Sequence, residues 1–301
     1  MDRLACRAAN LLVGNDERDA LLEATLIGPT IRFDEETLIA LAGGDLDPTI
    51  DGRPLPLWRP VRVPAGAVLR FGQARIGCRG YLAIAGGLDV PMLFDSRSTY
   101  LRGGFGGLNG RALRAGDAIR AREPGAVSRA ITKSLAGDGV VAARFSLARS
   151  LRPHYAEQPV VRVIRGMHAD ALDDASAARL TSDAFRISAS SDRMGYRLEG
   201  RPLTLRAPVE LLSEGVAFGT IQLPPGGAPI VLMADRQTAG GYPRIGEIAS
   251  VDLPLVAQLK PGDSLRFREV SLADAQRAYL QREMELRQAA AALTLRFIHG
   301  K

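Results

Sequence analysis

Residues able to bind a small anionic or amide-like ligand gather in three segments of the chain. The first covers residues 86–100 and joins a glycine pair to the run Ser-Arg-Ser-Thr-Tyr. The second covers residues 190–197 and the third covers residues 219–243. All three segments are dense in arginine, hydroxyl side chains and glycine, where apolar strands or plain turns would otherwise be expected. They are the candidate binding segments of this chain.

Arginine and glycine suit such a ligand for different physical reasons. A guanidinium group binds carboxylate or phosphate through two parallel hydrogen bonds, each worth about 1.5 to 3 kcal/mol. A glycine pair lets backbone N–H groups approach a ligand oxygen, and losing one such donor in an acyl-transfer transition state costs on the order of 3 kcal/mol. The alternative is structural, with Asp192 and Asp235 pairing with Arg193 and Arg236 to join loops. The residues alone leave both interpretations open.

Several common catalytic and binding motifs are missing from the sequence. It contains no Gly-x-x-x-x-Gly-Lys-Ser/Thr, no strand-linked Gly-x-Gly-x-x-Gly and no Gly-x-Ser-x-Gly. His154, His168 and His299 lie apart, without cysteine or carboxylate at metal-ligand spacing. Cys6 and Cys78 stand in no nucleophile setting. We therefore predict no P-loop, no dinucleotide site, no metal in this chain and no covalent catalysis by serine or cysteine.

Composition narrows the class of protein and its partners. The 301 residues are 46% hydrophobic and 24% charged, which is typical of a globular protein with one large or two ordinary domains. The formal charge of +6 comes almost wholly from scattered arginine and aromatic residues are only 5%, so nucleic acid is not an expected partner. Two cysteines, no long apolar stretch and no leader-like start predict a cytoplasmic protein without a membrane partner.

Turn residues divide much of the chain into short apolar runs. Between residue 22 and about residue 122, Gly, Pro and Asp recur roughly every 8 to 12 residues, the pattern of an all-β barrel or sandwich. Helix formers predict a short helix over 5–12. A second helix is predicted from 273 to about 295, after a Ser-Leu-Ala-Asp capping box. We expect this second helix to pack on its own domain rather than on a partner.

An internal repeat indicates that the β region is duplicated. Residues 113–123 and 259–269 share six of eleven residue types. In each copy a Gly-Asp turn leads into alternating apolar and arginine residues, which predicts a strand. A weaker third copy lies at 64–71. The alternative is that Gly-Asp turns are simply common in β proteins.

A second recurring motif favours duplication. The tripeptide Ala-Gly-Gly at 85–87 recurs at 239–241, in the same order relative to its Gly-Asp copy. Residues 125–150 are small and polar enough to form the crossover between the copies. We therefore predict two tandem β-barrel domains, an N-terminal one over 1–155 and a C-terminal one over 156–301 that includes the terminal helix.

Four stretches resemble a known family. They contain Ala-Gly-Gly-Leu-Asp-Val-Pro (within 81–91), Ser-Arg-Ser-Thr-Tyr (96–102), Asp-Arg-Met-Gly-Tyr-Arg (191–198) and Ala-Asp-Arg-Gln-Thr-Ala-Gly-Gly-Tyr-Pro (229–243). These motifs are similar to those of the biotin-dependent carboxyltransferase family, whose members are also named the C-type subunit of 5-oxoprolinase or allophanate hydrolase subunit 2. The resemblance runs from Met1 to about residue 268 and implies a mainly β fold of two tandem cyclophilin-like β-barrels. It also implies a heteromeric partner of the B type, similar to allophanate hydrolase subunit 1, and often a metal-dependent partner of the A type.

The start of the chain departs from the family pattern. Members usually open with a further segment that includes Val-Gln-Asp-Leu-Gly-Arg, and Met1 stands where that segment would end. The resemblance implies that the segment adds a first strand, together with an Asp and an Arg that line the site. Activity of this chain alone is therefore not expected.

The resemblance implies a component of a heteromeric 5-oxoprolinase, which opens 5-oxo-L-proline to L-glutamate with hydrolysis of ATP. The residues assigned to catalysis are Asp235, Arg236 and Gln237. Those assigned to substrate binding are Arg97, Ser191, Arg193, Tyr196, Gln222, Gly240, Gly241 and Tyr242. Because the chain has no P-loop, ATP is expected to bind mainly on partner chains or across an interface with them.

Two other functions stay open. In carboxyl transfer from carboxybiotin to urea, the chain would form only part of the acceptor site, because it has no Met-Lys-Met sequence for covalent biotin. A regulatory protein that sequesters a kinase-inhibitor-like partner of the B type is the third interpretation. A neighbouring gene for an A-type partner would favour the oxoprolinase, and a neighbouring biotin carboxylase gene would favour urea carboxylation.

Overall fold

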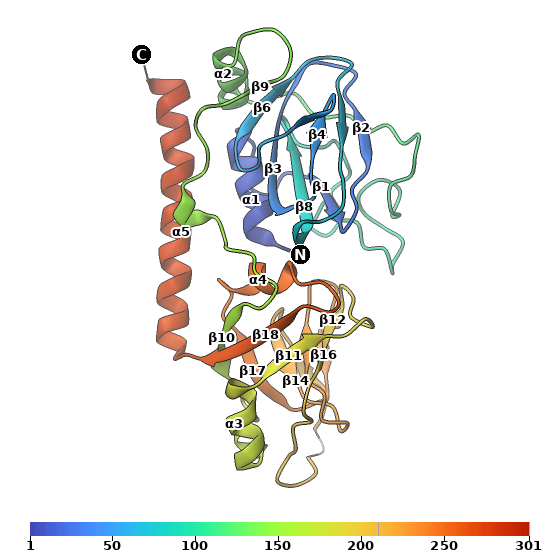
Figure 1. Ribbon diagram of the computed structural model, residues 1–301, viewed down its shortest axis with the longest axis vertical. Helices are drawn as coiled ribbons and strands as arrows, with labels where there is room; N and C mark the ends of the chain where they lie inside the picture. The colour runs from blue at the N-terminus through green and yellow to red at the C-terminus, as the bar shows by residue number, and fades with distance from the viewer. Residues whose placement is uncertain (210, 301) are drawn as a thin grey trace. The chain divides into compact units, whose positions relative to one another are not determined.

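The computed structural model describes residues 1–209 and 211–300 (Figure 1). The chain divides into two compact units. The N-terminal unit consists of Arg3–Arg152 together with the chain from Glu285 onward, and the C-terminal unit consists of Met1–Asp2 with Pro153–Met284. The change of unit after Arg152 lies close to the predicted boundary at 155, whereas each unit also takes in one end of the chain that the sequence had placed in the other.

The N-terminal unit is built on two sheets. The first has the order β1 (Leu22–Thr25), β8 (Ile76–Ile84), β3 (Thr37–Asp45), β6 (Pro60–Val63), β9 (Val141–Ala142). The second has the order β2 (Thr30–Arg32), β7 (Val68–Arg70), β4 (Thr49–Ile50), β5 (Arg53–Pro54). Helix α2 (Ala126–Ser134) lies in the stretch predicted to be a crossover.

The central strands of the N-terminal unit, β3 and β8, are buried along most of their length. Helix α1 (Arg3–Leu12) packs against both strands (Figure 1). Its small residues Ala5, Ala8 and Ala9 are fully buried, so the helix can approach the sheet closely. The apolar core cluster around Ile39 and Leu82 contributes further burial. Burial on two faces explains why these strands read as continuous apolar runs rather than as an alternating pattern.

The C-terminal unit contains a closed seven-stranded barrel (Figure 1). Its strands in order are β10 (Val160–Arg165), β17 (Arg244–Ile248), β14 (Thr220–Gln222), β15 (Ile230–Leu232), β12 (Gly195–Glu199), β11 (Ala184–Ile187) and β18 (Ser264–Glu269). The parallel pairing of β10 with β18 closes it. Outside the barrel lie the two-stranded ribbon of β13 (Glu214–Gly215) and β16 (Ala239–Gly240) and the helices α3 (Asp174–Ser182) and α4 (Leu253–Ala257).

The mainly β class and both predicted helices are confirmed. Helix α5 (Leu272–Thr294) begins where the capping box was predicted, with the Ser271 hydroxyl accepting a hydrogen bond from the Asp274 backbone N–H at 3.1 Å. Near its start, Ala275 packs on Ala249 and Val251 of the C-terminal unit. Within the described residues, no helix combines the length and apolar character that a membrane span requires.

The three copies of the repeat contain the same type of turn. Gly66, Gly116 and Gly262 have φ angles of +84°, +89° and +94°. In each copy the backbone N–H after this glycine donates to the carbonyl oxygen three residues earlier, at 3.1 to 3.3 Å. A third turn residue with positive φ defines a type II turn, which favours glycine there. The repeat is therefore a turn that recurs in both units.

The strand predicted after the middle copy of the turn is wrong. The copies at 64–71 and 259–269 continue into β7 and β18, but after Gly116 only an isolated bridge forms, between Leu88 and Ala121. The Asp117 carboxylate instead accepts two hydrogen bonds of 2.7 Å from the Arg111 guanidinium. Backbone pairing of this segment is confined to the bridge, where the Asp89 N–H donates to the Arg120 carbonyl oxygen at 2.8 Å and the Arg122 N–H donates to the Gly87 carbonyl oxygen at 3.0 Å.

One buried ion pair fastens the barrel to helix α4. The Asp252 carboxylate, just before α4, accepts hydrogen bonds from the backbone N–H, Nε and Nη2 of Arg162 on β10, at 2.7, 2.8 and 2.5 Å. The Asp252 side chain is only 5% exposed. Removing a buried partner leaves the other charge uncompensated, which is costly.

We expect Asp252→Ala to lower the free energy of unfolding by about 2 to 4 kcal/mol. The matched control is Glu157→Ala in the same unit, because Glu157 is 84% exposed and lies 3.9 Å from Lys260. That substitution should cost less than about 1 kcal/mol. Urea denaturation of the full chain followed by circular dichroism measures both changes. Equal losses in the two variants would contradict the importance assigned to the Asp252 pair.

Candidate functional site

Two polar residues of strand β14 are buried outside the barrel core. Ile221 points into that core, so its neighbours Thr220 and Gln222 face the opposite side of the strand. They are nevertheless only 0% and 1% exposed. A side chain added at Gly240, on the β13–β16 ribbon, would lie 2.6 Å from the Gln222 amide nitrogen. The ribbon therefore covers this polar face, and Gly240 leaves room for the Gln222 amide where the two meet.

A β-bulge gives the neighbouring strand β17 two polar residues on the same face. Along a regular strand, Arg244 and Glu247 are three positions apart and would point to opposite sides. The pairing shifts here, so that Thr220 lies opposite Glu247 and Gln222 lies opposite Arg244. The extra residue, Ile245, is buried in the barrel core. The bulge thus turns Arg244 and Glu247 together toward Thr220 and Gln222.

Glu247 is the group best placed to move a proton. The Thr220 hydroxyl oxygen lies 2.8 and 3.0 Å from its two carboxylate oxygens. Burial raises the pKa of Glu247 above its ordinary value, and the Thr220 hydroxyl together with the charges of Arg244 and Arg236 oppose this rise only partly. A carboxyl group with a raised pKa can hold and release a proton closer to neutral pH.

Two arginines flank Glu247. Arg236, just before the ribbon strand β16, points its Nε at the Val216 carbonyl oxygen, 3.4 Å away. Arg244 pairs with Glu214 and donates from Nη1 to the Gly215 carbonyl oxygen at 3.3 Å. Both guanidinium groups therefore hold the ribbon as well as placing positive charge near Glu247. An anionic ligand at this face would meet fork-shaped donors.

Of the two aspartates and two arginines that the sequence offered for structural ion pairs, Arg193 and Asp235 pair with each other. Arg193 donates from Nε and Nη2 to the Asp235 carboxylate at 2.9 and 3.2 Å. The backbone N–H of Asp235 also donates to the Arg193 carbonyl oxygen at 2.8 Å. Asp192 instead accepts the backbone N–H of Met194 at 2.8 Å. Arg193 and Asp235 therefore fasten the loop before β12 to the loop after β15.

Several predicted site residues have structural contacts of their own. The Tyr196 ring lies in the barrel core and its hydroxyl donates to the Leu259 carbonyl oxygen at 3.1 Å. The Ser191 hydroxyl accepts the backbone N–H of Arg197 at 3.0 Å. Arg97 belongs to the N-terminal unit, where its guanidinium donates to a backbone carbonyl of its own loop. Each of these contacts stabilises a local part of the fold.

The predicted residues of the third segment gather around Gln222. Its amide nitrogen lies 3.4 Å from the Tyr242 carbonyl oxygen and packs on Gly240. Gly241 lies beside a backbone carbonyl of the chain before β13. The side chains of Gln237 and Tyr242 are exposed. The structure thus brings Gln222, Gly240 and Tyr242 together, with solvent at one side.

Arg244 and Glu247 lie outside the site predicted from the sequence, and Thr220 lies in the third candidate segment but was assigned no role. The only available signal was a glutamate inside an apolar run that directly follows the Gly-Gly-Tyr-Pro motif. Its role depends on the bulge, which no local pattern indicates. Together with Gln222 and Arg236 these three residues form what we call the β14–β17 polar face.

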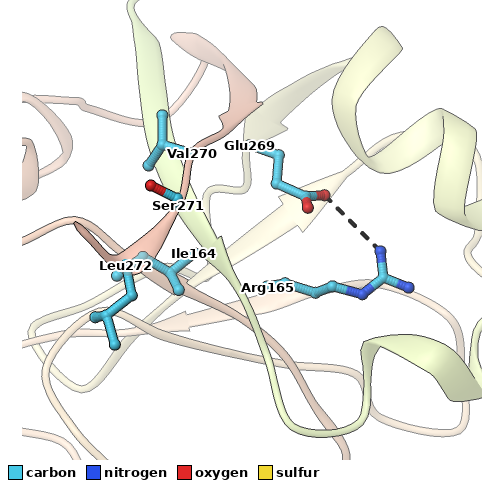
Figure 2. A pocket seen from close by; sticks show the side chains of 6 residues that line it. All are labelled: Ile164, Arg165, Glu269, Val270, Ser271 and Leu272. Atoms are coloured by element: carbon cyan, nitrogen blue, oxygen red, sulfur yellow. Dashed lines mark ion pairs between the residues drawn. The ribbon is translucent and has the colours of Figure 1, made fainter. Parts of the chain in front are cut away.

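An open hollow of about 400 Å³ lies elsewhere on the C-terminal unit (Figure 2). Its lining consists of Ile164, Arg165, Glu269, Val270, Ser271 and Leu272. Its charged groups already have partners, because Arg165 lies 3.9 Å from Glu269 and also pairs with Asp170. The Ser271 hydroxyl lies 2.6 Å from the Asp274 carboxylate. No predicted site residue lines this hollow, which offers less chemistry than the β14–β17 polar face.

Metal ligands are not grouped in the part of the chain that the structure describes. Across residues 1–209 and 211–300, no three His, Cys, Asp or Glu side chains are placed to hold a metal ion. His168 uses its Nδ1 to accept the backbone N–H of Arg244 at 3.1 Å. The chemistry available at the β14–β17 polar face is therefore hydrogen bonding, charge and proton transfer.

Comparison with known proteins identifies relatives that match over most of the chain. It is 35% identical over 287 residues to the C-type subunit of 5-oxoprolinase from Haemophilus influenzae, covering 95% of this chain and 86% of that protein. It is 37% identical over 280 residues to the C-type subunit of 5-oxoprolinase from Escherichia coli, covering 92% and 84%. The crystal structure of Kluyveromyces lactis urea carboxylase aligns with a TM-score of 0.86 and 28% identity, covering 96% of this chain and 26% of that one.

A family model that matches most of the chain establishes which family it belongs to. Residues 1–269 match the carboxyltransferase domain, subdomains A and B. This span contains every residue of the β14–β17 polar face and ends at the last residue of β18. The resemblance drawn from the sequence motifs is confirmed, and the chain belongs to the carboxyltransferase family that has subdomains A and B.

Proposed function

We propose that the chain is one component of a heteromeric, ATP-dependent 5-oxoprolinase that converts 5-oxo-L-proline to L-glutamate. The observation that carries this proposal is the match to two C-type subunits of 5-oxoprolinase over 86% and 84% of their own lengths. The identity of 34% to a putative urea carboxylase from Emericella nidulans is similar, but that match covers only 22% of the relative's length. Activity would require partner chains, one of the B type and one of the A type.

The substrate is a small cyclic amide that carries one carboxylate. In the proposed reaction the γ-phosphoryl group of ATP is transferred to the amide oxygen, and water adds to the activated carbon. The ring C–N bond then breaks, the ring nitrogen takes a proton, and a second water releases phosphate from the acyl phosphate. Such a sequence needs donors for developing negative charge and one acid for the leaving nitrogen.

The β14–β17 polar face has groups for each of these tasks. Arg236 would bind the substrate carboxylate or a phosphoryl oxygen through its guanidinium fork. Glu247 would supply the proton to the ring nitrogen, since burial raises its pKa. Gln222 would orient the amide, and Asp235 would act as a positioning residue through Arg193. ATP would bind mainly with the partner chains, because the sequence has no P-loop.

A second candidate function is carboxyl transfer of the urea carboxylase type. It is favoured by the alignment with Kluyveromyces lactis urea carboxylase at a TM-score of 0.86. In that case the same polar face would hold urea, a neutral amide with two N–H₂ groups and one oxygen. The carboxyl group would arrive on biotin carried by another chain, because this sequence has no Met-Lys-Met.

Reconstitution with partner chains separates these functions. The chain is co-expressed with its B-type and A-type neighbours, and glutamate released from 5-oxoproline is measured with and without ATP. The proposal expects glutamate only when all three chains and ATP are present. Urea-dependent bicarbonate consumption with a biotin carboxylase, without glutamate release, would establish the second candidate instead. A tight complex that turns over neither substrate would indicate a regulatory protein.

Substitution of Arg236 by alanine tests the anion-binding role. Loss of one charge-assisted donor at the reacting centre should lower kcat/KM for 5-oxoproline by about 100-fold or more in the complete complex. Circular dichroism and partner binding should be unchanged. The control is Arg268→Ala, which removes one exposed arginine from β18 of the same unit. Unfolding of the Arg236 variant alone would show that this arginine is structural.

The substitution Glu247→Gln tests the proton-transfer role through pH dependence. If protonated Glu247 is the acid, wild-type activity falls as pH rises through its raised pKa. The glutamine variant should lose about 100-fold or more in kcat and should no longer show this fall. An unchanged alkaline limb in the variant would rule out Glu247 as the titrating acid.

The pH dependence of the free energy of unfolding tests the raised pKa of Glu247 independently of activity. A carboxyl with a raised folded pKa stabilises the fold below its unfolded pKa, and this contribution is lost as pH rises through the folded value. Glu247→Gln cannot ionise, so its free energy of unfolding should change less with pH over that window than the wild-type value. Equal pH dependence in the two proteins would contradict the raised pKa itself.

A further inference from the structure

Three arginines of the N-terminal unit lie near one another without a carboxylate partner. Arg59 precedes β6, while Arg149 and Arg152 stand at the start of the short helix Arg149–Leu151 and directly after it. In the part of the chain that the structure describes, none of the three forms an ion pair. Other arginines of this unit do pair with carboxylates, among them Arg62 with Glu36, Arg111 with Asp117 and Arg122 with Asp19.

One loop, residues 143–147, binds two of the three side chains. The Arg59 Nη1 donates to the Ala143 carbonyl oxygen at 3.1 Å. Arg152 donates from Nε to the Leu147 carbonyl oxygen at 2.9 Å and from Nη2 to the Ser146 hydroxyl at 2.6 Å. Both guanidinium groups are thus fixed on the same short stretch of chain by neutral acceptors, which position the charge without neutralising it.

Several donors of this cluster stay available for a ligand. The guanidinium of Arg149 is exposed and makes no hydrogen bond with the described residues. Arg59 donates to the described residues only from Nη1, so its Nη2 also remains. Arg152 uses only Nε and Nη2, so its Nη1 remains.

The electrostatic environment of Arg152 distinguishes it from other arginines. Burial, and after it the positive charges of Arg59 and Arg149, lower the pKa of Arg152. Carboxylate partners have the opposite effect and raise the pKa of Arg111, Arg162, Arg165 and Arg201. The three like charges repel one another, and bound negative charge would offset that repulsion.

We propose that Arg59, Arg149 and Arg152 form a binding site for the phosphoryl group of a small ligand. A phosphoryl dianion offers at least three oxygens and two negative charges, so it can accept bonds from several guanidinium forks at once. A carboxylate has two oxygens and one charge, which one fork already satisfies. The ligand is free phosphate or the phosphoryl group of a nucleotide. The site belongs to the N-terminal unit, whereas the β14–β17 polar face belongs to the C-terminal unit, and the proposal does not depend on the proposed oxoprolinase activity.

Titration of the full chain with inorganic phosphate tests the site. Isothermal titration calorimetry at constant ionic strength, with chloride as the balancing anion, should give one saturable site. Arg149→Gln is the sharpest variant, because this side chain has no contact that the fold needs. It should weaken phosphate binding about tenfold, the value of one charge-assisted hydrogen bond. Arg53→Gln is the control, since it removes the same charge from an exposed position on β5 and should leave binding unchanged.

Parallel titrations with ATP, ADP and acetate identify the source of the phosphoryl group. Tighter binding of ATP or ADP than of phosphate, with the same loss in Arg149→Gln, assigns the site to a nucleotide. Equal or weaker nucleotide binding assigns it to free phosphate. The proposal is overturned if phosphate does not saturate, if acetate binds as tightly as phosphate, or if Arg53→Gln weakens binding as much as Arg149→Gln. A complex that binds phosphate but releases no glutamate would contradict only the proposed oxoprolinase function.

Discussion

The bulge between β14 and β17 is the constraint on which the candidate site depends. By taking Ile245 into the barrel core, it sets Arg244 and Glu247 on one face with Thr220 and Gln222. That face is polar and cannot be buried against an apolar layer without loss of hydrogen bonds. The β13–β16 ribbon meets this requirement, because it brings backbone carbonyls and a glycine to the polar side chains. The one inserted residue, Ile245, thus determines which polar side chains share this face and why the β13–β16 ribbon packs on it.

Arginine has two distinct uses in this protein. Around the barrel, Arg162 and Arg193 are held by Asp252 and Asp235, and each pair joins parts of the chain far apart in sequence. In the N-terminal unit, Arg59 and Arg152 are held instead by neutral carbonyl or hydroxyl groups, so their charge is not neutralised. A basic composition therefore says little about ligands until each guanidinium group is assigned its acceptor.

Local signals in the sequence were enough for part of the fold. The capping box predicted the start of α5, and the helix formers near residue 8 predicted α1, because both signals act within a few residues. The strand predicted after Gly116 was wrong because this segment forms only an isolated bridge to Leu88 instead of pairing with a strand, and the pairing partner of a segment cannot be read from its local residues. Glu247 was missed for a related reason: its place on the polar face follows from strand register, which depends on residues distant in sequence.

Each compact unit includes the chain terminus that is distant in sequence from its main segment. Asp2 is buried in the C-terminal unit, where its carboxylate lies 2.6 Å from the Tyr155 hydroxyl and 3.1 Å from the Gln258 amide nitrogen. The other end of the chain crosses in the opposite direction, because the part of helix α5 from Glu285 onward belongs to the N-terminal unit. During synthesis, the N-terminal unit cannot complete its packing when its own strands emerge from the ribosome, because the chain from Glu285 onward is made much later. Final assembly of the N-terminal unit must therefore follow synthesis of the C-terminal unit's strands, although each unit has its own core.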